Sequence, residues 1–250
     1  MGHESRKFCK FLPKPRSSYV SWKEQSLFRG ATQREPWLMK NQNPICWTGI
    51  SRIAIAVAIL MMLPGLARAT GPRSESGIEV DLKHGSENEQ KTKAQLLRLL
   101  ENYDLSKWMF TKKVMIDQDS IPHSHPVLTL HTRHLKSDDQ LLSTFVHEQV
   151  HHWLDANLKQ THAAVAELRK LYPKVPVGYP EGANDEDSTY EHLIVCYLEM
   201  AADRMFLGNE RTAKLMMFWA GDHYRWIYRT VVQDAKKIGQ IVENNGLQVN

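Results

Sequence analysis

His147, Glu148 and His151 stand at the spacing of an H-E-x-x-H motif, in which two histidines lie four residues apart. Residues four apart share one face of an α-helix, so both imidazoles can point at the same place. Zn²⁺ binds imidazole nitrogens at about 2.0–2.1 Å in a roughly tetrahedral arrangement. Glu148 would then sit beside the metal, where it can accept a proton from an attacking water. The motif therefore predicts a zinc ion, two of its ligands and a general base.

The residues around the motif predict a well-marked amphipathic helix. Ser137 followed by Gln140 resembles a capping box, which would start the helix just before the motif. Since a short motif also occurs by chance, the alternative is a helix whose histidines are simply solvated. A separate apolar face favours the metal site. Its side chains recur at helical spacing away from the two histidines, at Leu142, Phe145, Val146, Val150 and Trp153.

A third ligand must come from elsewhere in the chain, because a catalytic zinc site has three protein ligands. The stretch 190–206 is predicted to be a helix. On it, His192, Glu199 and Asp203 share one face. Glu199, His192 and Glu191 each carry an atom type that zinc accepts, so all three are candidates.

The pair of motifs resembles the gluzincin metallopeptidases, the thermolysin-like group, in which H-E-x-x-H is followed on a later helix by E-x-x-x-D. Glu199 and Asp203 stand at that spacing, and the resemblance covers about residues 138–208. It implies a zincin-like fold in which Glu199 is the third zinc ligand and Asp203 orients a ligating histidine. The chain is much shorter than thermolysin-like enzymes and is closer to a minimal form. The metzincin pattern fails, because Leu154 and Asn157 stand where it needs Gly and His.

Further catalytic candidates follow from the same resemblance. Thermolysin-like enzymes place a His and a Tyr opposite the zinc, where they stabilise the tetrahedral intermediate. His223 and Tyr224, at the start of the last predicted helix, are the candidates for that part. His192, if it is not a ligand, is a further candidate for donating to the oxyanion. The alternatives are aromatic packing for His223 and Tyr224, and a hydrogen-bonded core histidine for His192.

The first 69 residues have the layout of a secretory signal peptide with a long basic extension. An apolar core at 53–66 follows Arg52, and residues 67–69 give an A-x-A cleavage signal. The apolar run is shorter than the ~20 residues that cross a bilayer comfortably. We therefore expect cleavage after Ala69 and export to the periplasm or the outside, with translation starting at Met39. The alternative is an uncleaved signal that anchors the protein in a membrane.

Charge is divided unevenly between this leader and the rest of the chain. Residues 1–69 carry 11 Lys and Arg against 3 Asp and Glu, whereas residues 70–250 carry 21 against 25, a net charge of −4. The mature chain therefore has no basic surplus that would favour nucleic-acid binding. Cys196 is its one cysteine, which excludes an intramolecular disulfide, and the apolar neighbours of Cys196 predict burial.

Residues 70–250 are expected to form a single domain of the α+β class. The fold should be mainly helical, with a small N-terminal sheet packed on the motif helix. A loop at 172–187 is long enough to shape a functional site. Alternating or apolar runs predict strands at 78–82, 108–116 and 127–132. Helical spacing predicts helices at 87–103, from 138 through the motif, and at 160–171, 188–206, 210–219 and 223–242.

Together these patterns predict an exported zinc-dependent hydrolase, most simply a peptidase acting on a peptide or protein, with one zinc ion and Glu148 as general base. An extended substrate could pair with the strand at 127–132 if that strand lies at a sheet edge. A membrane would be involved only through an uncleaved signal. The alternative function is a non-catalytic exported domain that keeps the zinc site or binds a partner in the cell envelope.

Overall fold

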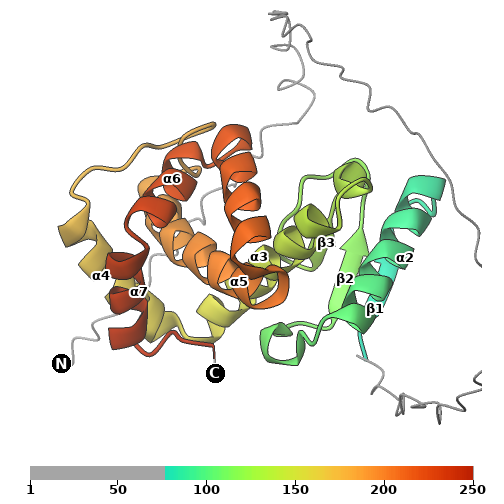
Figure 1. Cartoon of the computed structure of the whole chain (residues 1–250), viewed down its shortest axis with the longest axis horizontal. Coiled ribbons are helices and arrows are strands. Elements are labelled where there is room, and N and C mark those ends of the chain that lie inside the picture. The colour runs from blue at the N-terminus through green and yellow to red at the C-terminus, as the bar shows by residue number, and fades with distance from the viewer. Residues whose placement is uncertain (1–76, 250) are drawn as a thin grey trace, which may run out of the picture. The chain divides into compact units, whose positions relative to one another are not determined.

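The computed structural model describes residues 77–249, and Figure 1 shows their helices and strands along the chain. The predicted signal peptide, the cleavage after Ala69 and the start at Met39 lie outside the described residues. Within the described part, no helix is both long enough and apolar enough to cross a bilayer.

The sheet is small and parallel. Val80 lies opposite Val114, and Val114 lies opposite Leu128. All three side chains are buried, because residues in register on neighbouring strands share a face of the sheet. Helix α2 (Glu87–Asn102) makes the crossover that a parallel pair requires, and it packs against β1 and β2. The strand order is β1-β2-β3, with β1 at Glu79–Leu82, β2 at Lys113–Ile116 and β3 at Leu128–Leu130.

All three predicted strands are confirmed, but β2 is much shorter than expected. Residues 106–108 form a short 3-10 helix, and a side chain holds the backbone that follows. The buried amide of Gln149 accepts from the N–H groups of Phe110 and Thr111, both at 2.8 Å. It also donates to the Thr111 carbonyl at 2.8 Å. A residue inside the H-E-x-x-H motif thus ties the lead-in of β2 onto the motif helix.

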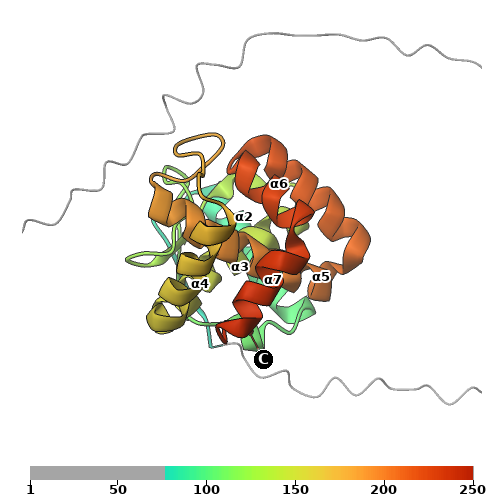
Figure 2. The same ribbon diagram turned by 90° about the vertical axis from the view of Figure 1, so that its left-hand side faces the viewer.

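The motif lies on α3 (Asp138–Ala156), and the predicted start of this helix is confirmed. The Ser137 side chain caps it by accepting from the Gln140 backbone N–H at 3.3 Å. The alternative of a helix with solvated histidines does not fit, since every residue from Leu141 to Val150 is buried. β3, α4 and α5 all contact α3, and Figure 2 shows it behind α4 and α7. Polar side chains of α3 therefore face protein, which demands partners for them.

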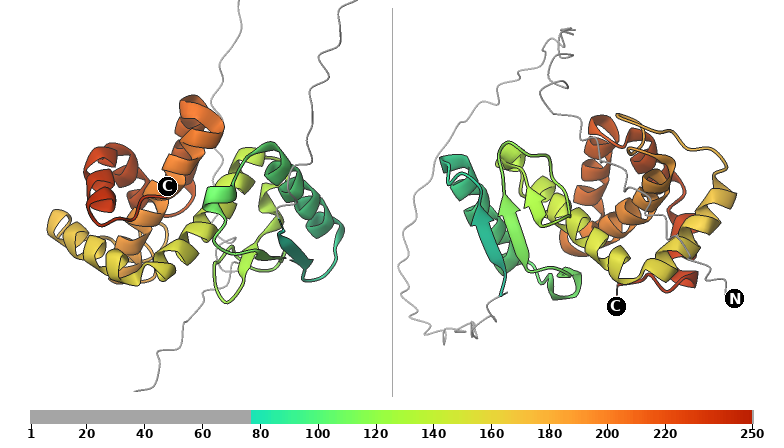
Figure 3. Two further views of the ribbon diagram at one scale, coloured as in Figure 1. Left: turned by 90° about the horizontal axis from the view of Figure 1, so that it is seen from below. Right: turned by 180° about the vertical axis from the view of Figure 1, so that it is seen from behind.

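The C-terminal half is a group of helices. α5 packs against both α3 and α6, and α7 contacts α4, α5 and α6. Figure 3 shows these helices at one end, the sheet with α2 at the other, and α3 between them. Their bounds are Leu158–Leu171 for α4, Glu186–Asp222 for α5, Arg225–Gln233 for α6 and Ala235–Asn244 for α7.

One predicted helix end is confirmed, and one predicted helix differs from the structure. Gly208 interrupts α5 where we expected a helix to end, because its φ of 78° and ψ of 168° are not helical, and glycine adopts a positive φ readily. The helical segments on either side of Gly208 meet at this kink. The predicted helix 223–242 is instead α6 and α7. It is broken at Asp234, whose φ of −111° and ψ of 24° are not helical.

The long loop between α4 and α5 is confirmed, and it is fastened to the start of α6. The Arg225 N–H donates to the Pro180 carbonyl at 2.9 Å, and the Trp226 N–H donates to the Glu181 carbonyl at 3.2 Å. Glu181 also forms an ion pair with Arg229 at 2.5 Å. The loop therefore fixes the backbone just after Tyr224.

The predicted α+β class is confirmed, since the described residues are mostly helical and include a small parallel sheet. β3 contacts α3, so the sheet does pack on the motif helix. Cys196 is fully buried with a free thiol, as its neighbours predicted.

Candidate metal centre

Three histidines converge from two helices. His147 and His151 lie one turn apart on α3, and His192 lies on α5. The ring centroids are 5.2 Å apart for 147 and 151, 5.6 Å for 147 and 192, and 4.9 Å for 151 and 192. One ring nitrogen of each histidine lies within 4.8 Å of those of the other two. The structure thus brings a third imidazole to the two of the motif.

The Nδ1 atom of each ring is held by an outer partner. A carboxylate or a carbonyl can only accept, so each Nδ1 carries the proton and donates. In the neutral ring each Nε2 then carries the lone pair, which is the form in which imidazole binds a metal. The contacts are His147 Nδ1 to Glu199 Oε2 at 2.9 Å, His151 Nδ1 to Glu191 Oε1 at 3.2 Å, and His192 Nδ1 to the Ser188 carbonyl at 2.6 Å.

Burial controls the charge of these rings. It lowers the pKa of His147 and of His192 well below the ordinary 6.5, so both are neutral at pH 7. Burial also acts to lower the pKa of His151, but the hydrogen bond to Glu191 and the charge of Glu148 outweigh it and raise that pKa. Two neutral imidazoles and one beside carboxylates form a site that favours a cation.

The Glu148 carboxyl lies beside the histidines and forms no hydrogen bond with the described residues. Its residue is 6% exposed. Burial raises its pKa to about 7, with the charge of His151 opposing the rise and that of Glu199 adding to it. A carboxylate with free lone pairs and a pKa near neutrality suits proton transfer at pH 7.

Glu199 lies behind His147 and is held by three donors. Its Oε2 accepts from His147 Nδ1 and from the Tyr228 hydroxyl, each at 2.9 Å. Its Oε1 accepts from the Ser143 hydroxyl at 2.5 Å. Burial raises the pKa of Glu199 to about 7, although the hydrogen bonds from Ser143 and Tyr228 lower it. Glu199 is thus placed to orient His147 and fix its tautomer.

The structure differs from two expectations drawn from the E-x-x-x-D spacing. Among residues 77–249, no group of ligand-type atoms joins Glu199 with both motif histidines, and Glu199 groups only with His147 and Cys196. Asp203 reaches no histidine, because its Oδ2 lies 2.9 Å from the Ser143 hydroxyl and its buried Oδ1 has no partner. The physical reason is the register of α5 along α3. His192 lies beside His151, Glu199 lies at the Nδ1 side of His147, and Asp203 lies beside Ser143, one turn before the motif.

Tyr224 and His223 lie beside the histidines at the entrance to α6. Tyr224 is the one non-glycine residue of the described part with a positive φ, at 48°. Its ring centroid lies 4.5 Å from that of His192 and 6.4 Å from that of His147. Burial raises its pKa, so the hydroxyl stays protonated. His223 Nδ1 lies 3.0 Å from Asp222 Oδ2. A strained backbone of this kind persists where the surroundings hold it, and it is common at functional sites.

Ser143 and Tyr228 are partners of the centre that the sequence did not reveal to us. Ser143 stands four residues before His147, so the stripe from Ser143 through His147 to His151 was a readable signal. Tyr228 gives no such signal, because its contact with Glu199 depends on how α6 packs on α5.

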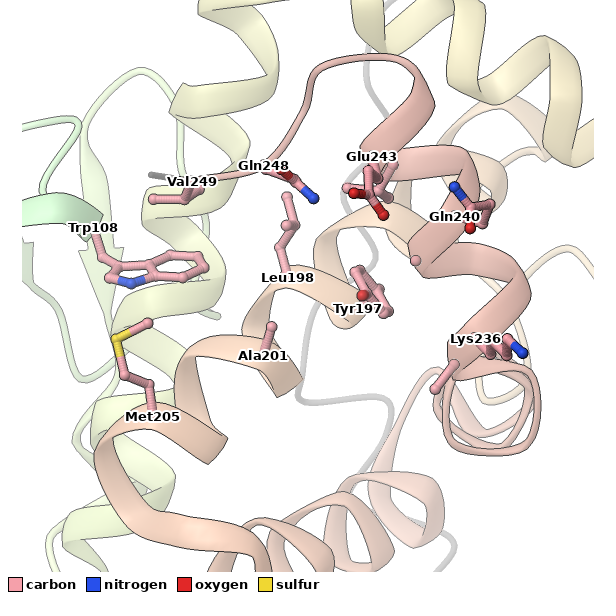
Figure 4. A pocket seen from close by; sticks show the side chains of 13 residues that line it. Trp108, Tyr197, Leu198, Ala201, Met205, Lys236, Gln240, Glu243, Gln248 and Val249 are labelled. Carbon is pink, nitrogen blue, oxygen red and sulfur yellow. The ribbon is translucent and has the colours of Figure 1, made fainter.

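Two other features lie apart from these histidines. His84, Glu89 and Asp117 bring three further ligand-type atoms together. A groove on the opposite side of α5 is lined by Trp108, Tyr197 and part of α7 (Figure 4). None of the predicted site residues lines that groove.

Comparisons of the chain with protein-family models, with curated proteins and with solved structures give no match. Function is therefore inferred from the residues and geometry of the site.

Proposed function

We propose that the chain is a zinc-dependent hydrolase that cleaves peptide bonds, with a zincin-like active site on α3. The observation that carries this proposal is the set of three imidazoles with free Nε2 lone pairs beside the uncommitted Glu148 carboxyl. His147, His151 and His192 would hold the ion. This set departs from the gluzincin pattern, because an imidazole takes the place of the glutamate ligand and Glu199 orients His147 instead. Three protein ligands leave the fourth position that a catalytic zinc site requires.

The donor chemistry fits zinc. The group contains three imidazoles and no carboxylate oxygen. Imidazole nitrogens suit Zn and its transition-metal neighbours, whereas carboxylate and carbonyl oxygens suit Mg, Ca and Mn. Each ring also has the carboxylate or carbonyl partner that usually fixes a ligating histidine.

Proton transfer falls to Glu148. Bound zinc would supply the Lewis acid that activates water and polarises the substrate carbonyl. Glu148 accepts a proton from the attacking water at a carboxylate oxygen, and then delivers it to the leaving amine nitrogen. Its pKa of about 7 in the metal-free protein suits both transfers, because the carboxyl can gain and lose a proton near neutral pH.

Tyr224 is the group best placed to donate to the developing oxyanion. Its hydroxyl forms no hydrogen bond with the described residues and remains protonated. Its ring lies against the ring of His192, and the fastened loop holds its backbone. Removing one such donor typically lowers kcat about 10²–10³-fold. His223 is assigned to packing beside it, since the His223 Nδ1 atom is committed to Asp222.

Strand addition at 127–132, which the sequence suggested, is not part of the proposal. β3 does lie at the sheet edge. However, the Thr129 N–H donates to the His123 carbonyl at 2.7 Å, and the His123 N–H donates to the Thr129 carbonyl at 3.1 Å. A peptide could pair with Thr129 only after that bridge opened.

Export is proposed on the sequence of residues 1–69 alone. The A-x-A signal and the short apolar core support removal of the leader and a periplasmic or secreted product. An uncleaved signal would instead leave the same site tethered to a membrane.

The proposal is tested by comparing Glu148→Gln with Glu210→Gln, a control at an exposed glutamate on α5. We expect wild type and both variants to bind about one zinc per chain, as a single catalytic site requires. Removing the general base should lower the rate of peptide-library cleavage about 10²–10⁴-fold, and the control should keep it. Wild-type protein that binds no zinc at micromolar supply contradicts the proposal. Bound zinc without cleavage of any peptide supports the non-catalytic alternative.

A further inference from the structure

Two buried carboxyl groups share one hydroxyl behind His147. Ser143 Oγ lies 2.5 Å from Glu199 Oε1 and 2.9 Å from Asp203 Oδ2. The indole Nε1 of Trp219 lies 3.1 Å from the same Oγ. All four of these side chains are almost fully buried, so solvent does not satisfy or screen them.

If both carboxyl groups were ionised, these contacts would lack one proton. Trp219 can only donate, so its N–H occupies a lone pair of Ser143 Oγ. The Ser143 hydroxyl has a single proton, which can point at only one carboxyl oxygen. The second oxygen would then face an Oγ lone pair at hydrogen-bond distance, which is repulsive. A further proton must therefore lie between Ser143 and either Glu199 or Asp203.

Glu199 is the better place for the negative charge. Its carboxylate has three donors, namely Ser143, His147 and Tyr228, and donors of this kind stabilise the ionised form. Asp203 has the Ser143 contact, while its Oδ1 is buried without a partner. A buried charge with an unpaired oxygen is far more costly than a neutral acid in the same place. Burial and the charge of Glu199 raise the pKa of Asp203 well above its ordinary value, which points the same way.

We propose that Asp203 is a neutral carboxylic acid that donates to Ser143 and so acts as a positioning residue for the metal centre, an inference that rests on the proposed function. The Asp203 O–H donates to Ser143 Oγ, the Ser143 O–H donates to Glu199, and Glu199 accepts from His147 Nδ1. This chain fixes the direction of the Ser143 proton. It thereby keeps a single negative charge on Glu199, next to His147. The role differs from that implied by the gluzincin resemblance, in which the aspartate orients a histidine directly.

The protonation of Asp203 can be read by infrared difference spectroscopy of the full chain. Subtracting the spectrum of Asp203→Asn from that of wild type at neutral pH should leave the C=O stretch of a protonated carboxylic acid. Asp187→Asn, at an exposed aspartate on α5, should leave the bands of an ionised carboxylate. Ionised-carboxylate bands for Asp203 overturn the inference. This measurement does not require zinc, so its outcome is separate from success or failure of the proposed function.

Zinc affinity tests the positioning role. An asparagine at 203 keeps an N–H donor for Ser143, so Asp203→Asn should bind zinc as tightly as wild type. Ser143→Ala removes the donor to Glu199 and should lower zinc affinity about 10–100-fold. Asp203→Leu, which offers Ser143 no donor, should lose affinity as Ser143→Ala does. Affinity that Asp203→Leu keeps, or that Asp203→Asn loses, overturns the positioning role. Loss in leucine with rescue by asparagine supports it, because leucine fills a similar volume and lost packing alone would not separate the two variants. Since an asparagine can also turn its carbonyl oxygen to Ser143, the infrared measurement decides whether Asp203 donates.

Discussion

Two groups of side chains in the described part invite comparison, because each brings three metal-type ligand atoms within 4.8 Å of one another. One is the histidine group of α3 and α5, and the other is His84 with Glu89 and Asp117. They differ in enclosure, since the His84 side chain is 41% exposed and that of His147 is 9% exposed. They differ more in whether their lone pairs are already in use.

The His84 group is occupied by the protein's own donors. The Glu89 carboxylate accepts from the backbone N–H groups of His84, Ser86 and Gln118 at 2.9, 3.3 and 3.2 Å. Burial acts to raise the pKa of Glu89, but these hydrogen bonds outweigh it and lower that pKa. The carboxylate is therefore a cap for the start of α2 and the turn after β2. In the histidine group every outer contact uses Nδ1, which leaves Nε2 free. Close ligand atoms thus indicate a metal centre only where their lone pairs remain available.

The largest expected difference between the two groups is in zinc binding. His192→Ala removes a proposed ligand and should lower zinc affinity by more than about 100-fold, beyond the effect of losing an outer partner. His84→Ala should leave zinc affinity unchanged. Competition with a chromogenic chelator measures both variants against wild type. Equal losses in the two variants would show that the comparison is wrong.

Glu148, beside the histidine group, and Glu89, in the His84 group, should respond to pH in opposite ways, because the pKa of Glu148 is raised and that of Glu89 is lowered. The pKa of Glu148 is raised from 4.5 to about 7, so in the zinc-free protein the folded state holds this proton more tightly than the unfolded state. That contribution to stability is complete below pH 4.5 and is lost as the pH rises through about 7. Glu148→Gln, which cannot titrate, should gain roughly 3 kcal/mol relative to wild type between acid and mildly alkaline pH. Urea unfolding at both pH values measures the change, and a constant difference would refute the raised pKa.

Loss of the outer partner Glu199 should have an intermediate effect. Glu199→Ala leaves the Nδ1 proton of His147 without its acceptor and should lower zinc affinity about 10–100-fold. The comparable change in the other group, Glu89→Ala, should destabilise the fold without changing the zinc affinity of the folded protein. Isothermal titration with zinc, beside thermal unfolding, separates the two effects. Complete loss of zinc in Glu199→Ala, with retention in His192→Ala, would restore Glu199 as the ligand.

The smallest predicted effect is on the cap itself. Glu89→Gln keeps one acceptor oxygen and loses the other, so it should lower the free energy of unfolding by about 1 kcal/mol. Urea denaturation of the zinc-free protein measures this. A much larger loss in the free energy of unfolding would indicate that Glu89 has a function beyond the cap.

Much of the local structure was predictable because local signals define it. The three strands, the start of α3 after Ser137 and the burial of Cys196 follow from alternation, capping and apolar neighbours. The parallel pairing of the strands was not readable, since it depends on long-range contacts through α2. The interruption of α5 at Gly208 was predicted, but the sequence could not show that the two helical segments join there at a kink.

Only part of the candidate site could be predicted from the sequence, and the reason is geometric. His147 and His151 lie on one helix, so their spacing alone predicts that they converge. The residues His192, Glu199 and Asp203 share a face of α5, and spacing cannot tell which of them stands level with the motif. The register of α5 along α3 decides this, and it brings His192 to the two motif histidines. The resemblance favoured Glu199, which the structure places on the other side of His147.

The most direct measurement is a crystal structure of the zinc-loaded chain with anomalous data collected at the zinc edge. We expect one peak, about 2.0–2.1 Å from the Nε2 atoms of His147, His151 and His192. Glu199 should remain hydrogen-bonded to His147 Nδ1. A peak coordinated by the Glu199 carboxylate in place of His192, or no peak at this site from zinc-loaded crystals, would contradict it.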